Sequence, residues 1–470
     1  MVARNIIFIT VDCLRADFLE LDSRFDFEIF QRLFNEGIWF TNMLSVGPNT
    51  PLAFSGLFSS SYPSMWGGYL YLGKKRVTLA EVLKSQDIET AGIHSNPHLI
   101  SIYGYNRGFD YFYDYTQSQR GKITKIAGDF HRRYKEKYKR SKFLKSIIDR
   151  ISENKLLNIL VQKFISQSPY EEVDIMNVKA MKWLEGRDKR KRFFLWVHYM
   201  EPHVPYMVDE EIKKFLPVKD IDRWSGAKLV LKARENPDSL SALEKETIKL
   251  LYLSQIKYLE LKMDEFLNYL FNNSLMEETL LIFSADHGTE LLEHGVFGHA
   301  PIWYKENEIK LFNTVLKVPF LIYGRKIDGK RNENLASSID IAPTICALLG
   351  IKSPENWLGQ NLLASDFKRE MVISEQIYFE EDKIQDAFAF QTQDEKFIYD
   401  LSRGIYYYYD LKKDPEEMEN CMDIHPQKKK EIERYYLSHN RLILDTYRKP
   451  KTSIMVDSEI RKRLESLGYL

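Results

Sequence analysis

Cysteine is scarce in this chain, and neither sign of charge is in excess. The 470 residues include only 3 cysteines, Cys13, Cys346 and Cys421, and their spacing forms no pairs. Such a small odd number argues against a disulfide framework and indicates reduced thiols. The 67 basic residues balance the 67 acidic ones, so the formal net charge is zero. A dedicated nucleic-acid binder would carry a basic excess, and we therefore expect no nucleic-acid partner.

Long apolar runs are also missing. No uninterrupted apolar stretch reaches the roughly 20 residues that a membrane-spanning helix needs. The N-terminal MVARN leads directly into IIFITV, without the pattern of a secretory signal and its cleavage site. We therefore expect a soluble, cytoplasmic protein without a transmembrane anchor. Because 44% of the residues are hydrophobic, the chain can bury a large core and form more than one domain.

Short β-branched and aromatic runs alternate along the chain with longer helical patterns. This order is typical of an α/β fold, in which helices cover a sheet. The expected strands are Asn5–Val11, Thr90–His94, Phe193–His198, Thr279–Ser284 and Pro319–Tyr323. The expected helices are Phe27–Asn35, Thr78–Ser85, Asp174–Leu184 and Leu243–Phe271.

Two regions depart from this alternation. Residues 119–150 hold 12 Lys or Arg against 3 Asp or Glu, with apolar residues interleaved, which predicts a basic helical insertion over 119–165. Its basic face could attract an anionic substrate or an anionic surface, or it could simply be a solvated face. After about residue 370, AFAFQTQDEKFIYD and GIYYYYDL predict a small antiparallel sheet, and a charged helix follows. We therefore divide the chain into a main domain, 1–370, and a C-terminal subdomain, 371–470.

Three of the expected strands lead into groups that bind metal ions. Asp12 follows the first strand in VDCLRAD, and Asp286 and His287 follow another strand in SADHG. His198 and His203 come with a third strand, in HYMEPHVPY. Ligands of α/β sheets bind beyond the carboxyl ends of the strands. We therefore expect a divalent cation at this edge of the sheet.

Each of these segments also has a purely structural interpretation. Asp12 could cap a helix, and the turn after His287 could need a positive φ at Gly288. His198 or His203 alone would more often be a partly buried histidine with its hydrogen bonds satisfied. The coincidence of these groups at strand ends favours a site over three unrelated features.

The stretch VGPNTPLAFSGLFSSSYP raises a similar choice at Thr50. Pro51 suits the first turn of a helix, and a threonine just before it is a good N-cap. The hydroxyl of Thr50 could instead do chemistry at the positive end of that helix. The presence of Asp12, Asp286 and His287 elsewhere in the chain favours a chemical role for the Thr50 hydroxyl.

Together these segments resemble the sulfatase and alkaline-phosphatase superfamily, and more narrowly its sulfatase-like branch. The resemblance covers most of the chain in the order of the family's landmarks, apart from 119–165 and the tail after Ile432. It implies an alkaline-phosphatase-like mixed sheet sandwiched by helices, with a small C-terminal antiparallel sheet. The segments that carry it are NIIFITVDCLRAD, NTPLAFSGLFSSSYPSMWGG, SNPHLISIYGYNRGFDYF, VHYMEPHVPY, FSADHGTELLEHGVFGHA, KVPFLIYG, SIDIAPTICALLGI and YYDLKKDPEEMEN.

The resemblance implies a metal site and a nucleophile. Asp12, Thr50, Asp286 and His287 fall on the family's metal-ligand positions. Thr50 also falls on the position of the metal-bound nucleophile. Two carboxylates, a hydroxyl and an imidazole suit one Mn²⁺ or Zn²⁺ ion, and Mg²⁺ or Ca²⁺ less well because of the imidazole.

Further residues are implied to contact the substrate. His203 falls where a histidine contacts the transferred group. His299, in FGHA, falls near a basic residue that binds the anionic oxygens of the substrate. Arg15 lies beside the first metal ligand, although it could simply pair with Asp17. Substrate binding is implied less specifically for Asn96, His98 and Arg15.

The chain departs from true sulfatases in two respects, the nucleophile motif and the pair of aspartates after the first strand. Their nucleophile position holds a cysteine that is oxidised to formylglycine, in a C-x-P-S-R type motif. Thr50 stands here, so no formylglycine forms, and Phe54 replaces the motif's arginine. Cys13 replaces the second of two adjacent aspartates found in many sulfatases, and we expect it to be a small buried packing residue.

These departures predict a metal-dependent hydrolase of phosphate monoesters or diesters that acts on an anionic ester through Thr50. A metal ion would turn the threonine hydroxyl into a competent nucleophile. The alternatives are a sulfatase, a transferase of phosphorylated headgroups and a binding protein without activity. The retained Asp12, Thr50, Asp286, His287 and His203 argue against the last of these.

Overall fold

The computed structural model describes residues 3–21, 27–69, 71–117, 170–206, 208, 210–216, 221–299, 308–380 and 383–447. The basic insertion predicted over 119–165, with its anionic contacts, lies outside these residues. Within the described residues, no helix is long and apolar enough to cross a membrane. The cytoplasmic location stays a prediction.

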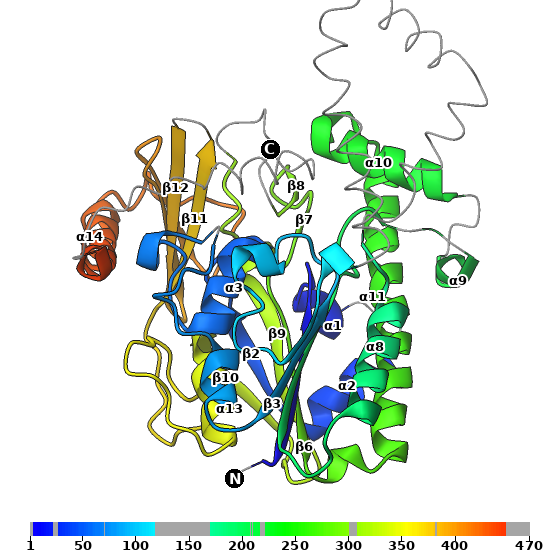
Figure 1. The fold of residues 1–470 in the computed structure, drawn as a ribbon. Coiled ribbons are helices and arrows are strands. Elements are labelled where there is room, and N and C mark those ends of the chain that lie inside the picture. Colours follow the sequence, from blue (N-terminus) through cyan, green and yellow to red (C-terminus); the bar gives the residue numbers. More distant parts are fainter. Residues whose placement is uncertain are drawn as a thin grey trace, which may run out of the picture.

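An eight-stranded mixed sheet forms the centre of the molecule (Figure 1). Its strands are β1 (Asn5–Val11), β2 (Ile38–Leu44), β3 (Glu89–His94), β4 (Tyr111–Tyr113), β5 (Phe193–Tyr199), β6 (Thr279–Ala285), β9 (Lys317–Tyr323) and β10 (Lys330–Ser337). Their order is β10-β2-β9-β6-β1-β5-β3-β4. Neighbours run parallel, except that β9 is antiparallel to both β2 and β6. The predicted mixed α/β sheet is thus confirmed.

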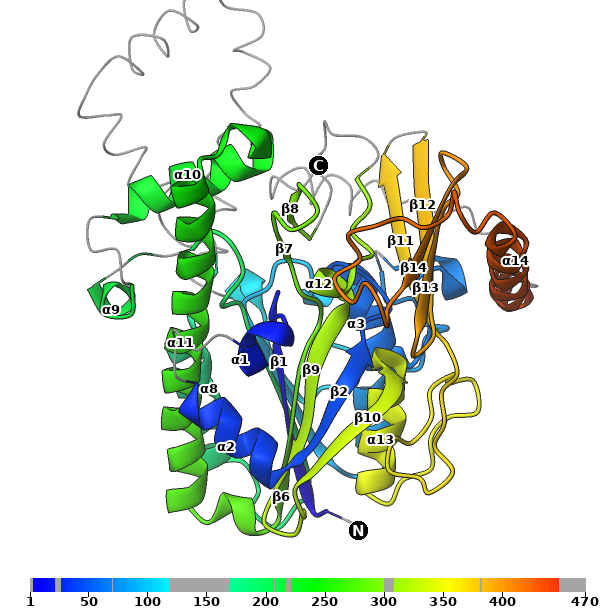
Figure 2. The ribbon, with the colours of Figure 1, turned by 180° about the vertical axis from the view of Figure 1, so that it is seen from behind.

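Helices cover both faces of this sheet (Figure 1, Figure 2). One face carries α1 (Asp17–Leu21), α2 (Glu28–Glu36), α8 (Val173–Gly186) and the long α11 (Ala242–Asn272). The short α9 (Glu210–Lys213) and α10 (Arg223–Glu235) pack against α11. The opposite face carries α3 (Thr50–Ser59), α4 (Leu79–Lys84) and α13 (Ile341–Leu348). The four predicted helices correspond to α2, α4, α8 and α11.

The apolar strands follow from this two-sided cover. Every residue of β1, β5 and β6 is buried, as expected where helices pack on both faces.

The start of α11 is fixed by a capping box. The Ser241 side chain accepts the N–H of Glu244, and the Glu244 side chain accepts the N–H of Ser241.

A second sheet follows in the C-terminal part. It is antiparallel and consists of β11 (Val372–Glu380), β12 (Lys383–Gln391), β13 (Glu395–Asp400) and β14 (Ile405–Asp410), in chain order, with α14 (Lys428–Tyr447) packed on it. This confirms the predicted small sheet and helix, while the domain division at 370 stays a prediction. The N–H of Glu375 in β11 donates to the carbonyl of Val46 at 2.8 Å. The hydroxyl of Ser374 donates to the carbonyl of Ser45 at 2.6 Å, so this sheet braces the loop that leads into α3.

The parallel strands bring distant segments to one edge of the central sheet. Val11 at the end of β1 pairs with Tyr199 of β5 on one side and with Ala285 of β6 on the other. The N–H of Asp12 donates to the Tyr199 carbonyl at 2.9 Å, and the N–H of Asp286 donates to the Val11 carbonyl at 3.2 Å. Asp12 and Asp286 therefore leave the sheet at the same level.

Candidate active site

Thr50 is the first residue of α3, with its hydroxyl directed at the ends of β1 and β6. The N-cap of the helix is Asn49, whose side chain accepts the N–H of Leu52 at 3.1 Å. The interpretation of Thr50 as the cap is therefore wrong. Its Oγ1 lies 3.3 Å from Asp12 Oδ2 and 3.3 Å from His287 Nε2. Because Asn49 satisfies the helix end, the Thr50 hydroxyl is available for chemistry.

The structure brings the four predicted metal ligands together. Thr50 Oγ1, Asp286 Oδ2 and Asp12 Oδ1 lie 3.3, 3.4 and 3.7 Å from Nε2 of His287. Nδ1 of His287 lies 2.8 Å from the carbonyl oxygen of Gly288, so Nδ1 carries the proton and Nε2 offers its lone pair. Ligand atoms of a tetrahedral site with metal bonds of about 2.0–2.1 Å are about 3.3 Å apart. The observed separations match that spacing.

Two carboxylate oxygens of this group support the presence of a cation. Asp12 Oδ1 and Asp286 Oδ2 are buried and have no hydrogen-bond partner among the described residues. Burial raises the pKa of Asp286 well above its ordinary value, and the negative charge of Asp12 raises it further. A divalent cation between the two carboxylates would offset both effects. These residues therefore fit one divalent ion, whose identity stays a prediction.

Asn96 and His198 hold Asp12 from another side. The amide of Asn96 donates to Asp12 Oδ2 at 2.8 Å, and His198 Nε2 lies 3.8 Å from the same oxygen. Nδ1 of His198 lies 2.9 Å from the hydroxyl of Thr10, its partner in the pairing of β1 with β5. Asn96 thus positions Asp12, one of the candidate metal ligands. The sequence placed His198 among the strand-end groups of the expected cation site but assigned it no specific contact, because only the strand register shows that it faces Asp12.

His98 and Arg15 are the weaker substrate-binding candidates. The side chain of His98 is exposed, and its N–H donates to Asn96 Oδ1 at 2.8 Å. The Arg15 guanidinium is buried and lies 2.6 Å from Asp17 Oδ2 and 2.5 Å from Glu293 Oε1. These ion pairs favour the structural alternative considered for Arg15 over substrate binding.

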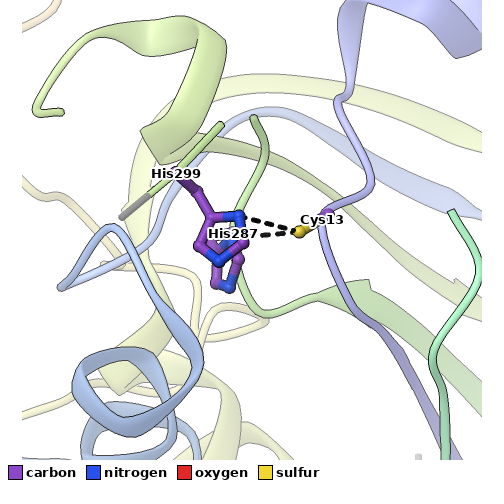
Figure 3. A group of neighbouring side chains, drawn as sticks. All are labelled: Cys13, His287 and His299. Carbon is purple, nitrogen blue, oxygen red and sulfur yellow. Dashed lines mark hydrogen bonds between the residues drawn. The ribbon is translucent and has the colours of Figure 1, made fainter. Parts of the chain in front are cut away.

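Cys13 lies beside the two histidines His287 and His299 (Figure 3). Its Sγ is 3.9 Å from Nδ1 of His287 and 3.2 Å from Nδ1 of His299. Burial raises the pKa of the Cys13 thiol well above its ordinary value, so the thiol keeps its proton and can donate it to Nδ1 of His299. The side chain is buried as predicted, but it is also a hydrogen-bond partner and not only a packing residue.

His203 and His299 lie together at the side of the site. Their ring centroids are 5.3 Å apart, and His299 is 4.4 Å from the ring of His287. Burial lowers the pKa of both imidazoles, and that of His299 falls well below its ordinary value with His287 and His203 beside it. Nδ1 of His203 contacts the carbonyl oxygen of Val204, which leaves its Nε2 available. Both rings are therefore neutral near pH 7 and can exchange hydrogen bonds with a substrate oxygen.

A cavity of about 120 Å³ lies beside these histidines. Its lining includes Cys13, His203, Tyr206, Arg234 and His299. Arg234 belongs to the last turn of α10. Sequence reasoning missed it because α10 carries no motif, and only the packing of α10 against β8 (Phe297–Gly298) brings it near His299.

Two of the structural interpretations prove wrong. Asp12 caps no helix, because α1 begins only at Asp17. Gly288 does not have a positive φ. It is required for close packing instead, because a Cβ there would clash with the carbonyl oxygen of Thr314. The DHG turn is thus held tightly against a neighbouring segment, which fixes His287.

Comparison with known protein families identifies two matching models. One, described as Sulfatase, matches residues 4–351, and the other, described as N-sulphoglucosamine sulphohydrolase, C-terminal, matches residues 302–440. An arylsulfatase of Clostridium perfringens is 24% identical over 260 residues, which cover 52% of each chain. Arylsulfatase K of Homo sapiens is 30% identical over 131 residues, or 27% of this chain and 23% of that protein. The matches thus span about half the length of these curated relatives or less.

Solved structures of the same fold extend the likeness over nearly the whole chain. A protein solved in complex with its substrate D-glucosamine-2-N,6-O-disulfate has a TM-score of 0.68 at 18% identity, covering 94% of this chain and 98% of that chain. The phosphonate monoester hydrolase of Agrobacterium radiobacter has a TM-score of 0.68 at 17% identity, covering 93% and 96%. The relatives are mostly sulfatases, so they support the sulfatase alternative better than the predicted preference for phosphate esters. Because the Sulfatase model matches residues 4–351, well over half of the chain, this protein belongs to the sulfatase family.

Proposed function

We propose that the protein hydrolyses sulfate esters, with Thr50 as the nucleophile and one divalent ion held by Asp12, Thr50, Asp286 and His287. The observation that carries the proposal is the position of Thr50 Oγ1, 3.3 Å from both Asp12 Oδ2 and His287 Nε2 at the start of α3. A hydroxyl that only caps a helix does not require a carboxylate and an imidazole beside it, and Asn49 is already the cap of this helix.

The chain's own residues prepare this hydroxyl for attack. When bound, the ion would lower the pKa of the threonine hydroxyl and polarise an oxygen of the ester. Asn96 keeps Asp12 in place, and the Nδ1 proton on the Gly288 carbonyl keeps Nε2 of His287 directed at Thr50. The N-terminus of α3 adds the positive end of a helix dipole where negative charge gathers.

His203 and His299 would act on the transferred group. Attack by Thr50 Oγ1 would form a bond to sulfur and break the bond from sulfur to the alcohol oxygen. The neutral imidazoles can donate to the sulfuryl oxygens. The proton that the Thr50 hydroxyl loses would pass to an imidazole or a water molecule and from there to the oxygen of the leaving alcohol. Water would then cleave the sulfo-threonine and restore the hydroxyl.

Phosphate or phosphonate esters are the second candidate, and the identity of Thr50 is the observation that favours them. Formylglycine releases sulfate by elimination from a geminal diol, and this route is closed to a threonine. Hydroxyl nucleophiles beside metal ions are better suited to phosphoryl transfer in this respect. Headgroup transfer stays a less supported alternative of the same site.

A panel of chromogenic esters separates these candidates. The purified protein is loaded in turn with Mn²⁺, Zn²⁺, Mg²⁺ or Ca²⁺ and assayed on aryl sulfate, phosphate, phosphodiester and phosphonate. We expect sulfate ester cleavage with at least one ion, and none by a folded Thr50→Ala variant. Faster cleavage of the phosphorus esters with every ion would replace the first candidate by the second. Wild-type turnover in Thr50→Ala would remove Thr50 as the nucleophile.

A further inference from the structure

The cavity beside His203 and His299 carries a fixed positive charge, that of Arg234. Arg234 lines the cavity from the last turn of α10, and His299 lines the same cavity. Its charge is among the causes that lower the pKa of both histidines, so the guanidinium acts on each ring. The ribbon views show α10 on the same side of the molecule as β8 (Figure 2).

Among the described residues that line this cavity, Arg234 is the one Lys, Arg, Asp or Glu. The other lining residues with polar side chains are Cys13, His203, Tyr206, Thr289 and His299. The guanidinium is therefore the fixed charge of the cavity.

Arg234 has no carboxylate partner among the residues that the structure describes. Within the described part of the chain no Asp or Glu forms an ion pair with it, and its side chain is exposed. Lys232 in the same helical turn differs, because its Nζ lies 2.7 Å from Glu244 Oε1. An unpaired guanidinium at a cavity is suited to bind an oxyanion through two parallel hydrogen bonds.

We propose that Arg234 forms an anion subsite for the leaving half of the substrate. The substrate is then an ester whose alcohol carries a second oxyanion, such as a carboxylate, sulfate or phosphate. The cavity of about 120 Å³ is well below the roughly 300–1,000 Å³ of pockets that bury a drug-sized ligand. It therefore takes one charged group of the alcohol and not the whole molecule.

This inference rests on the proposed function, because it places the ester group at Thr50 and the second anion at Arg234. The two ends of the substrate are then recognised by different chemistry. The metal ligands and Thr50 receive the sulfuryl group, while the guanidinium selects the alcohol by charge. An alcohol without a second anion leaves Arg234 solvated, and its binding affinity does not increase through this residue.

Kinetics on two matched esters test the subsite. The metal-loaded full chain is assayed on nitrophenyl sulfate and on the same ester with a carboxylate on the ring. Hydrogen bonds to charged groups contribute about 1.5–3 kcal/mol, so Arg234→Ala should raise KM for the carboxylate ester about 10- to 100-fold. KM for the plain ester and kcat for both should change little. Lys232→Ala is the matched control, since it removes a charge from the same turn that is already paired, and it should leave both KM values unchanged.

A binding measurement keeps the test independent of turnover. Calorimetry compares nitrophenol with hydroxynitrobenzoate, and then with alcohols that carry sulfate or phosphate, on wild type and Arg234→Ala. We expect wild type to bind the anionic alcohols more tightly than nitrophenol, and Arg234→Ala to show no such difference. Arg234→Lys, which keeps the charge but not the two parallel donors, should bind them with intermediate affinity. The alcohol that wild type binds most tightly identifies the anionic group. Equal binding of charged and uncharged alcohols by wild type, or no loss in Arg234→Ala, would overturn the subsite even if sulfate esters are hydrolysed. Anion-dependent binding without any ester hydrolysis would support the subsite and reject the reaction.

Discussion

Replacing Asp286 by asparagine should stabilise the metal-free protein and abolish its response to metal. In the wild type the N–H of His287 donates to Asp286 Oδ1 at 2.8 Å. Asparagine retains an oxygen that can accept this hydrogen bond, and it removes the negative charge. Asp286 Oδ2 and Asp12 Oδ1 lie 3.4 and 3.7 Å from the same nitrogen of His287, so they are at most about 7 Å apart. Two like charges at that distance repel by about 2 kcal/mol at an effective dielectric constant of about 20. Metal-free Asp286→Asn should gain about that much in free energy of unfolding at neutral pH.

The pH dependence gives the sign of this effect. Burial and the charge of Asp12 raise the pKa of Asp286 above its ordinary value of 3.8 in the folded state. The folded state therefore binds the proton more tightly, and metal-free wild type loses stability as pH rises from about 4 toward the raised pKa. Asp286→Asn has no such proton, so its stability should be flatter over this range.

Metal should reverse the ranking of the two proteins. An ion at 100 times its Kd stabilises the folded wild type by about 2.7 kcal/mol, and a variant that no longer binds it gains nothing. Urea denaturation of both proteins, with chelator and with Mn²⁺ or Zn²⁺, measures all four free energies. Bound metal is counted separately by elemental analysis. A metal-free variant that is less stable than wild type, or one that still gains the full metal stabilisation, would refute the assignment of Asp286 as a ligand.

Three further outcomes follow from the same contacts. Thr50→Ala should abolish turnover with little change in stability. Asn49→Ala should lower the free energy of unfolding, measured by urea denaturation, by about 1 kcal/mol because Asn49 is the cap. The reverse pattern would restore Thr50 as the cap. Gly288→Ala should lower stability by about 1–3 kcal/mol, since its Cβ would clash with a neighbouring backbone carbonyl, and an unchanged midpoint would contradict this. Burial lowers the pKa of His294, but the hydrogen bond to Glu290, the charge of Glu290 and the contact with the Glu416 carbonyl together outweigh burial and raise the pKa above 6.5. The resulting stabilisation is present below pH 6.5 and is lost as pH rises through the raised pKa, so His294→Gln should destabilise the protein at pH 6 more than at pH 8.

The strands that build the site were predictable because they are buried on both faces. NIIFITV, FFLWVH and TLLIFS read as continuous apolar runs, and the structure confirms each of them as a central strand, the last two being one residue longer than predicted. Their carboxyl ends meet at one edge by the geometry of a parallel sheet, so Asp12, Asp286 and His287 could be placed together from sequence. The antiparallel direction of β9 and the strand order could not, because apolar runs carry no information about direction.

Contacts that depend on register or on tertiary packing were out of reach. His198 faces Asp12 only because it stands opposite Thr10 in the pairing of β5 with β1. Arg234 reaches the cavity through the docking of a helix whose sequence resembles any solvated helix. Asn49 and Thr50 are both good capping residues, so the sequence could not tell which of two neighbours accepts the helix N–H groups.

Cys13 shows how a substitution can leave a site intact while changing its surroundings. The sequence places a thiol where many sulfatases have a second aspartate, which suggests a metal shell with one carboxylate replaced. The structure argues otherwise, because Sγ lies on the Nδ1 side of His287, while Nε2 faces Thr50 and Asp286. The candidate ligands Thr50 and Asp286 therefore lie on the other side of the His287 ring, and the Cys13 thiol contacts His299. A thiol that donates to Nδ1 leaves the proton of neutral His299 on Nε2, the nitrogen then able to donate to a substrate oxygen.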